Sequence, residues 1–208
     1  AVLADDPRAP SLLADLLLIA NPDLHPREYA AARTANAQYE FWRGDLDLAE
    51  ASYREALARW QGMGEALPAI QAQGALWRVE ALTGRFCAVA PVLKAAENLE
   101  EQPARDAAAA MRALGVTLAA ATGERSDGDT GAAAEAIAAE VFALLSSGNR
   151  LAAASELAFA AKVTGSSRLG DEAARLFAAM EVVPPAVVRG RLNQNPPWQV
   201  AHRQCFSY

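Results

Sequence analysis

The stretch from Ala35 to Trp60 reads ANAQYEFWRGDLDLAEASYREALARW and decides the fold. Its apolar residues follow a helical pattern through Tyr39 and Trp42, stop at Gly44, and follow a second helical pattern through residues 46–57. The sequence therefore predicts a helix, a tight turn at Gly44, and a second helix.

Equivalent turns recur at Gly84 and Gly123, so that the three glycines stand 40 and then 39 residues apart. A repeat of that length, built from two helices, is typical of an α-solenoid. Positions five, nine and twelve residues after a turn glycine are apolar, which predicts one buried stripe on each following helix. These positions are Ala49, Tyr53 and Ala56 after Gly44, Val89, Leu93 and Ala96 after Gly84, and Ala153, Leu157 and Ala160 after Gly148. Positions five and three residues before the glycines, such as Ala143 and Leu145, are predicted to face inward as well.

Prolines, glycines and polar turns divide the rest of the chain. The pattern predicts a short helix from Ser11 to Ala20, a helix from Pro26 to Trp42, a hairpin over 132–146 and 150–163, and a last helix from Asp171 to Met180. Three parts follow: an N-terminal loop and short helix over 1–27, a helical-repeat domain over 28–180, and a proline-rich C-terminal tail over 181–208, which lacks a periodic stripe.

The composition favours an all-α fold. Alanine has the best helix propensity, strands prefer β-branched and aromatic residues, and this chain has a large excess of alanine. The formal net charge is −6, and the sequence contains no cluster of lysine and arginine residues. This balance argues against direct nucleic-acid binding, which needs a basic patch.

Cysteine usage and hydropathy indicate a cytoplasmic protein. Cys87 and Cys205 lie far apart and form no CxxC half-site. The longest apolar run, Leu12 to Ala20, is short and contains Asp15, which predicts neither a membrane span nor a signal peptide. The chain begins at Ala1 and not at methionine, which suggests a domain of a longer protein or a processed end.

Residues 44–57, GDLDLAEASYREAL, match the second half of a tetratricopeptide repeat, with its turn glycine and aspartate, its alanine, its aromatic residue and its closing Ala-Leu. The spacing of the turns exceeds the usual repeat of about 34 residues. With the order of elements from Pro103 to Met180, it is similar to the carboxy-side repeat domain of LuxR-type and MalT-like bacterial transcriptional regulators. The resemblance covers residues 28–180. It implies an α-solenoid of antiparallel helical hairpins that senses or transmits a signal.

In that family an ATPase module precedes the repeats and a helix-turn-helix follows them. This chain has no GxxxxGK[ST] phosphate loop, and the residues after Met180 do not follow the helix-turn-helix pattern. We therefore expect neither ATP nor DNA to bind this chain itself.

The candidate binding residues lie on the first helix of each hairpin, which lines the concave face of such an array. Arginines among them can bind a carboxylate in bidentate geometry. Trp42 is predicted to lie near an edge, beside its turn, whereas Tyr53 and Trp60 are expected to fill the space between hairpins. The predicted binding residues are Arg33, Gln38, Trp42, Gln71, Arg78, Arg105 and Arg112. The alternative is a solvated face with ordinary i,i+4 ion pairs.

No catalytic or metal-binding constellation stands out in the sequence. His25 and His202 are isolated, and a metal site needs several ligands at workable spacing. The loop with Asp127 and Asp129 does not follow the EF-hand pattern. We therefore expect a protein that is not an enzyme and that needs no cofactor and no metal.

These observations favour a protein- or peptide-binding helical-repeat module, the sensing or interaction part of a bacterial regulatory protein, without direct nucleic-acid or membrane binding. Two alternatives stay open. A pocket between hairpins would make the chain a small-molecule sensor or an all-α enzyme. An interface on the concave face would make it a self-association domain that forms a homo-oligomer.

Overall fold

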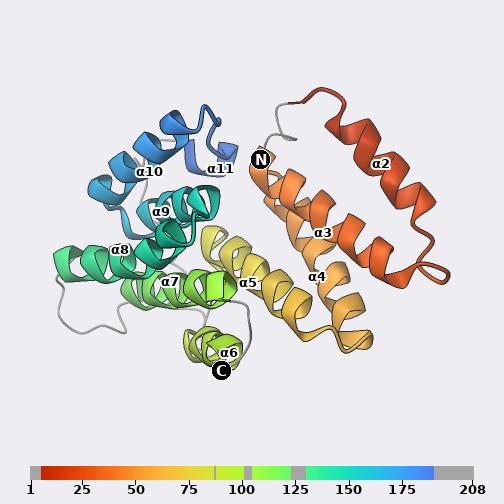
Figure 1. The fold of residues 1–208 in the computed structure, drawn as a ribbon, viewed down its shortest axis with the longest axis horizontal. Helices are drawn as coiled ribbons and strands as arrows, with labels where there is room; N and C mark the ends of the chain where they lie inside the picture. The colour runs from red at the N-terminus through yellow and green to blue at the C-terminus, as the bar shows by residue number, and fades with distance from the viewer. Residues whose placement is uncertain (1–5, 87, 101–104, 123–129, 190–208) are drawn as a thin grey trace. The chain divides into compact units, whose positions relative to one another are not determined.

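The structure is a computed structural model that describes residues 6–86, 88–100, 105–122 and 130–189. Within these ranges every regular element is a helix, which confirms the all-α prediction (Figure 1). The helices are α2 (Ala9–Ile19), α3 (Pro26–Arg43), α4 (Leu46–Gly62), α5 (Ala66–Leu82), α6 (Ala90–Glu100), α7 (Arg105–Thr122), α8 (Thr130–Ser146), α9 (Arg150–Thr164), α10 (Ser167–Ala179) and α11 (Ala186–Arg189).

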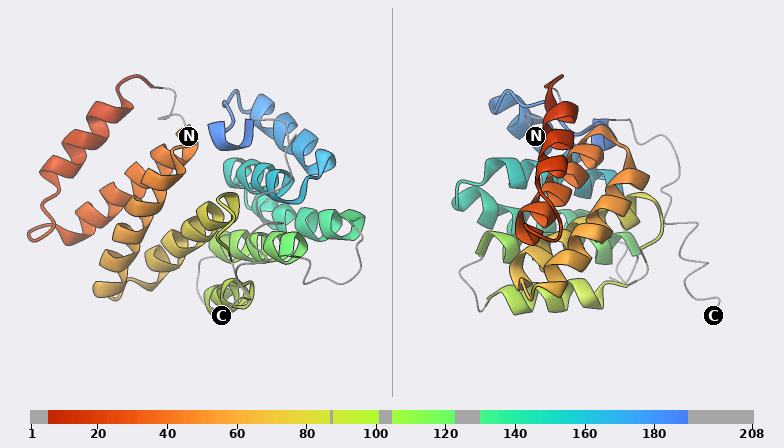
Figure 2. Two further views of the ribbon diagram at one scale, coloured as in Figure 1. Left: turned by 180° about the vertical axis from the view of Figure 1, so that it is seen from behind. Right: turned by 90° about the vertical axis from the view of Figure 1, so that its right-hand side faces the viewer.

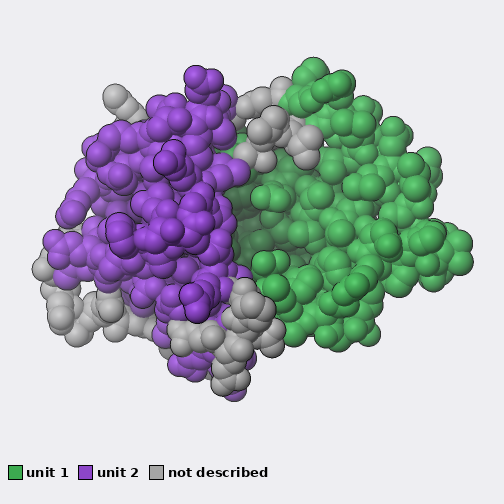
Figure 3. All heavy atoms as spheres, viewed as in Figure 1, with its two compact units in different colours: residues 1–79, 185–189 green, residues 80–184, 190–208 purple. Residues whose placement is uncertain are grey.

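The chain divides into two compact units, which Figure 3 colours separately. Unit 1 comprises residues 1–79 and 185–189, and unit 2 comprises residues 80–184 and 190–208. Unit 1 therefore holds α2, α3, α4, most of α5, and α11, whereas unit 2 holds α6 to α10. The predicted limits of the helical-repeat domain, at 28 and 180, stay a prediction.

The turn glycines have the backbone that was expected of them. Gly44, Gly84 and Gly148 have φ angles of 91°, 74° and 85°, a left-handed conformation that glycine adopts without strain. After Gly44 the N–H of Asp45 donates to the carbonyl of Glu40 at 2.9 Å, which closes the helix end. A further turn, which was not predicted, occurs at Gly64, with φ of 72°. Gly123 lies outside the described residues.

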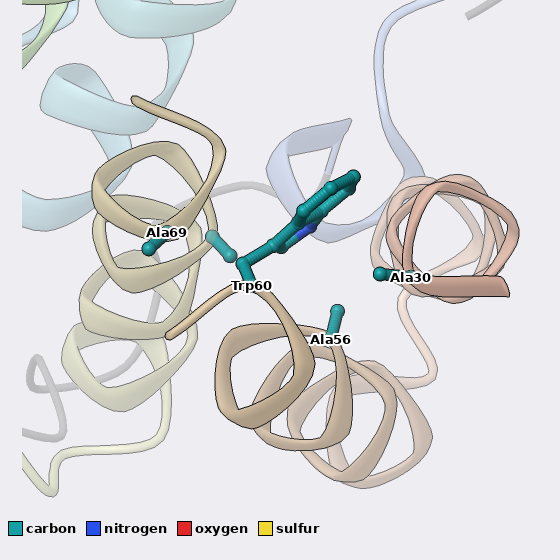
Figure 4. Packing of buried hydrophobic residues seen from close by; sticks show 5 residues of the cluster. Ala30, Ala56, Trp60 and Ala69 are labelled. Atoms are coloured by element: carbon teal, nitrogen blue, oxygen red, sulfur yellow. The ribbon is translucent and has the colours of Figure 1, made fainter. Parts of the chain in front are cut away.

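In unit 1, α3 and α4 form a hairpin whose helices lie side by side in Figures 1 and 2. The predicted stripe on α4 is confirmed, because Ala49, Tyr53 and Ala56 are all buried. Trp60 lies where α3, α4 and α5 meet, beside Ala30, Ala56 and Ala69, as Figure 4 shows. The small alanine side chains leave space between the three helices for the large indole ring of Trp60.

In unit 2, α7 packs against α6, α8 and α9, and α10 packs on α9. α8 and α9 are in contact, as expected for 132–146 and 150–163, but α8 packs more extensively against α7, and α9 against α10. Ala153, Leu157 and Ala160 are buried as predicted. The largest side chains in this core include Leu114, Leu118, Ile137, Leu144 and Phe177.

Two predicted inward positions are wrong. Leu93 is 42% exposed and Ala143 is exposed. The buried side of α6 includes Val92 and Leu99 instead, and Leu93 lies at the edge of this buried side. Ala143 faces a surface cleft that is described below.

Two predicted helix starts are also wrong. The first helix begins at Ala9 and not at Ser11, because Pro10 is accepted in a first helical turn. The last long helix begins at Ser167 and not at Asp171. There the Ser166 hydroxyl accepts the N–H of Leu169 at 3.4 Å and caps the helix four residues earlier.

Gly115, in the middle of α7, leaves room for Leu93. A Cβ at this position would lie 2.6 Å from Leu93 Cδ2, which is closer than van der Waals contact allows. We expect Gly115→Ala to change the free energy of unfolding by less than about 0.5 kcal/mol, because the new methyl group must displace the end of the partly exposed Leu93 side chain and this cost offsets the gain in helix propensity. In a Leu93→Ala background the same change should stabilise the protein by about 0.5–1 kcal/mol.

Urea unfolding of the four proteins, followed by circular dichroism, gives the coupling free energy between the two positions. Equal effects of Gly115→Ala in both backgrounds would show that Leu93 does not fill this space.

Candidate functional site

The predicted binding residues are divided between the two units. Arg33, Gln38, Trp42, Gln71 and Arg78 belong to unit 1, and Arg105 and Arg112 belong to unit 2. Gln38 and Gln71 are exposed, and Arg78 is half-buried. The prediction that Trp42 lies near an edge is wrong. Only 4% of Trp42 is exposed, so it is a core residue.

Arg33 is engaged within unit 1. Its guanidinium forms an ion pair with Glu55 and lies 5.8 Å from the centre of the Tyr29 ring. The Tyr29 hydroxyl donates to Glu55 Oε1 at 2.6 Å. Burial, the largest influence on the pKa of Glu55, raises it, but hydrogen bonds from Tyr29 and Arg33 together hold it below its usual value. Arg33 thus joins α3 to α4 through a partly buried ion pair between two helices, which differs from the i,i+4 pairs on a solvated face that were the predicted alternative.

A second polar group in unit 1 surrounds Tyr53. Asn36 Nδ2 donates to Glu40 Oε1 at 2.8 Å and to Ser52 Oγ at 3.3 Å. Burial raises the pKa of Tyr53, with the nearby charges of Arg78 and Glu40 acting in opposite directions. This group lies within the packing of α3, α4 and α5, so it ties the helices together.

Arg105 and Arg112 lie together in unit 2, in a surface cleft of about 450 Å³. This volume is within the range of small-ligand pockets. The first half of α7 and the last turns of α8 form the walls. The lining residues are Arg105, Asp106, Ala108, Arg112, Ala143, Ser146 and Ser147. Positions 105, 108 and 112 share one face of a helix, which explains why the two arginines meet.

Ionic and hydrogen-bonded partners fix most of the polar groups of this cleft. Arg112 Nε donates to Glu140 Oε2 at 2.7 Å, and both side chains are about one-third exposed. Asn149 Nδ2 donates to Asp106 Oδ2 at 3.3 Å, while Asn149 Oδ1 accepts the N–H of Ala152 at 3.3 Å and caps α9. Asn149 therefore joins one wall of the cleft to the next helix.

Arg105 differs from the other charged groups of the cleft. It is exposed, and within the described part of the chain it has no carboxylate partner. Ser146 and Ser147 donate their hydroxyls to carbonyls of their own helix, at 2.8 Å and 2.9 Å, so their oxygens remain acceptors. The cleft thus offers a cation at one point and several acceptor oxygens elsewhere.

Arg105 and Arg112 were predicted from the sequence, whereas Asp106, Ser146, Ser147 and Asn149 were not. Asn149 directly follows a turn glycine and precedes a helix, which is a visible capping signal. The serines had no such signal, because their place in the cleft depends on how α8 packs against α7.

No protein-family model, curated protein or solved structure matches this chain. Within the described segments, no helix combines the length and apolar character that a membrane span needs. The same segments hold no group of three or more His, Cys, Asp or Glu side chains that could bind a metal ion.

Proposed function

We propose that this chain is a non-enzymatic helical-repeat module that binds a protein or peptide segment, as the sensing or interaction part of a cytoplasmic bacterial regulatory protein. The observation that carries the proposal is the cleft of unit 2, where Arg105 has no partner among the described residues. The tetratricopeptide-like residues 44–57 support the α-solenoid fold, and the hairpins α3–α4 and α8–α9 agree with it.

The chemistry of the cleft favours a peptide. Arg105 would accept the carboxylate of an acidic residue or a chain end in a charge-assisted hydrogen bond. Asp106 and the serine oxygens would accept backbone N–H groups, which a peptide supplies at every residue. A bound segment would therefore satisfy the arginine and the acceptors together.

A small molecule with a carboxylate and an amine is the second candidate, since the cleft has the volume of a small-ligand site. Such a compound would make the chain a small-molecule sensor. An NMR titration with a peptide and with a free amino acid can separate the two candidates.

The test uses the ¹⁵N-labelled chain and three probes: an acetylated, amidated Gly-Glu-Gly peptide, the matched Gly-Gln-Gly peptide, and free glutamate. The glutamate peptide is expected to shift the NMR signals of Arg105 and of the last turn of α8. Arg105→Glu should weaken this binding at least tenfold, since a hydrogen bond to a charged group contributes about 1.5–3 kcal/mol.

Arg175→Glu is the matched control, because Arg175 is an exposed arginine on α10 outside the cleft. It should leave the affinity unchanged. Equal binding of the two peptides, or full binding by the Arg105→Glu variant, would contradict the proposal. Tighter binding of free glutamate than of the peptide would favour the sensor.

A further inference from the structure

A large aromatic side chain is exposed beside the cleft of unit 2. Of the phenylalanines that the structure describes, Phe142 alone is exposed, at 67% of its surface. It precedes Ala143 on α8, and its carbonyl accepts the hydroxyl of Ser146, one turn later, at 2.8 Å. Ala143 and Ser146 both line the cleft. Because residues four apart are neighbours on a helix surface, Phe142 borders the cleft on the side of Ser146.

The position of Phe142 is more informative than its exposure. Single exposed apolar residues are common on protein surfaces. Here, however, the exposed ring adjoins a cleft whose Arg105 has no carboxylate partner among the described residues. Aromatic residues and arginine are the side chains that contribute most to protein-binding surfaces. The cleft and the ring together therefore offer one charged and one apolar contact to the same ligand.

The contacts between α7 and α8 determine how far the ring lies from Arg105. Arg112 Nε donates to Glu140 Oε2 at 2.7 Å, and seven residues earlier on α7 stands Arg105. Arg105 shares the cleft with Ser147, which stands seven residues after Glu140, so the helices run antiparallel and these two residues are level. Phe142 precedes Ser147 by five residues, which is about 7.5 Å along the helix axis.

We infer that the cleft selects an extended peptide segment that carries an acidic residue and a large apolar residue two positions away from it. This inference rests on the proposed function and narrows its ligand. Two residues of an extended chain span about 6.6 Å, which is close to the separation along the helices. Residues two apart also project from the same side of such a chain. The acidic side chain would therefore reach Arg105 while the apolar one covers the ring of Phe142.

The other charged groups of the cleft are already engaged. Arg112 is paired with Glu140, and Asp106 Oδ2 accepts the Asn149 side-chain amide at 3.3 Å. The exposed guanidinium of Arg105 is left for a ligand carboxylate. Free glutamate would supply this carboxylate but would leave the ring uncovered, and an apolar peptide would leave the guanidinium unpaired. The combination of the two side chains therefore separates the inferred ligand from both.

The experiment is an NMR titration of the full ¹⁵N-labelled chain with four acetylated, amidated peptides: Gly-Gly-Gly-Glu-Gly, Gly-Leu-Gly-Glu-Gly, Gly-Glu-Gly-Leu-Gly and Gly-Gly-Leu-Glu-Gly. The second and third peptides place leucine two positions from glutamate in either chain direction. At least one of them should bind about fivefold more tightly than the leucine-free peptide, because it buries part of a leucine side chain. The fourth should bind like the leucine-free peptide, since adjacent side chains point to opposite sides.

Variants of Phe142 assign the gain to this ring. Phe142→Ala should remove the advantage of the spaced leucine and leave the affinity for the leucine-free peptide unchanged. Phe142→Leu should keep most of the advantage, because it keeps a large apolar side chain. Leu48→Ala is the matched control, since Leu48 is 58% exposed on α4, in the other unit. It should change none of the four affinities.

The outcomes separate this inference from the proposed function. If Arg105→Glu weakens the binding of the glutamate peptides but leucine adds nothing, the inference is overturned and the proposed function stands. A leucine advantage that Phe142→Ala does not reduce would also overturn the inference alone. If no glutamate peptide binds, or if Arg105→Glu binds all of them unchanged, the proposed function fails and the inference fails with it.

Discussion

Replacing Trp60 with alanine is expected to lower the free energy of unfolding by about 3–5 kcal/mol. Trp60 is 8% exposed and lies among Ala30, Ala56, Ala69 and Ala72. The alanine side chains cannot rotate into the void left by the indole, whereas the partly buried Leu57 and Met63 can fill part of it, so the loss should fall within this range. Urea unfolding followed by circular dichroism measures it.

Trp60→Phe separates the ring from its hydrogen bond. The indole Nε1 donates to Thr34 Oγ1 at 3.2 Å, and phenylalanine keeps an aromatic ring but has no such donor. We expect this variant to lose about 1–2 kcal/mol. A loss below about 1 kcal/mol in Trp60→Ala would show that the helices close over the site, against the packing described here.

Replacing Phe177 with alanine should cost a similar amount, about 3–5 kcal/mol, in unit 2. Phe177 is 2% exposed and follows Leu169 and Ala173 at intervals of four residues, which together form the buried side of α10. The Phe177 ring is as deeply buried as the core residues of α8 and α9. The same unfolding measurement applies.

Phe142→Ala is the matched control for this prediction. Phe142 is the same residue type in the same unit, but it is 67% exposed on α8. Its removal should change the free energy of unfolding by less than about 0.5 kcal/mol. Similar losses from both phenylalanines would contradict the assignment of Phe177 to the core.

Much of the fold could be predicted because its signals are local. A left-handed turn favours glycine whatever surrounds it, so Gly44, Gly84 and Gly148 were visible in the sequence. The turn at Gly64 was missed, since Gly62 stands two residues before it and either glycine could end the helix.

Positions that depend on a neighbouring helix were harder to predict. Val92 and Leu93 are adjacent in a helical pattern, and the pattern alone does not decide which of them faces inward. The answer depends on α7, where Gly115 accepts Leu93 at its edge. Likewise, Ser166 and Asp171 are equally suitable helix caps in the sequence. The structure shows that Ser166 caps α10, so the helix begins four residues earlier than predicted.

The candidate site shows the same limit. Arg105 and Arg112 were predicted to lie on the first helix of a hairpin, and the structure brings them into one cleft. Arg33 looked equivalent in sequence, but its ion pair with Glu55 comes from the next helix. The walls formed by Ser146 and Ser147 could not be predicted, because they depend on tertiary packing.

The alanines that surround Trp60, where α3, α4 and α5 meet, affect the entropy cost of folding unit 1. Alanine has no rotamers to lose on folding, so burying Ala30, Ala56, Ala69 and Ala72 costs almost no side-chain entropy. Each methyl group also contributes little favourable energy, about 0.8 kcal/mol per buried carbon. The indole of Trp60 therefore contributes more buried apolar surface than any alanine of this cluster, and oxidative damage to that ring would loosen the packing of the three helices at this point.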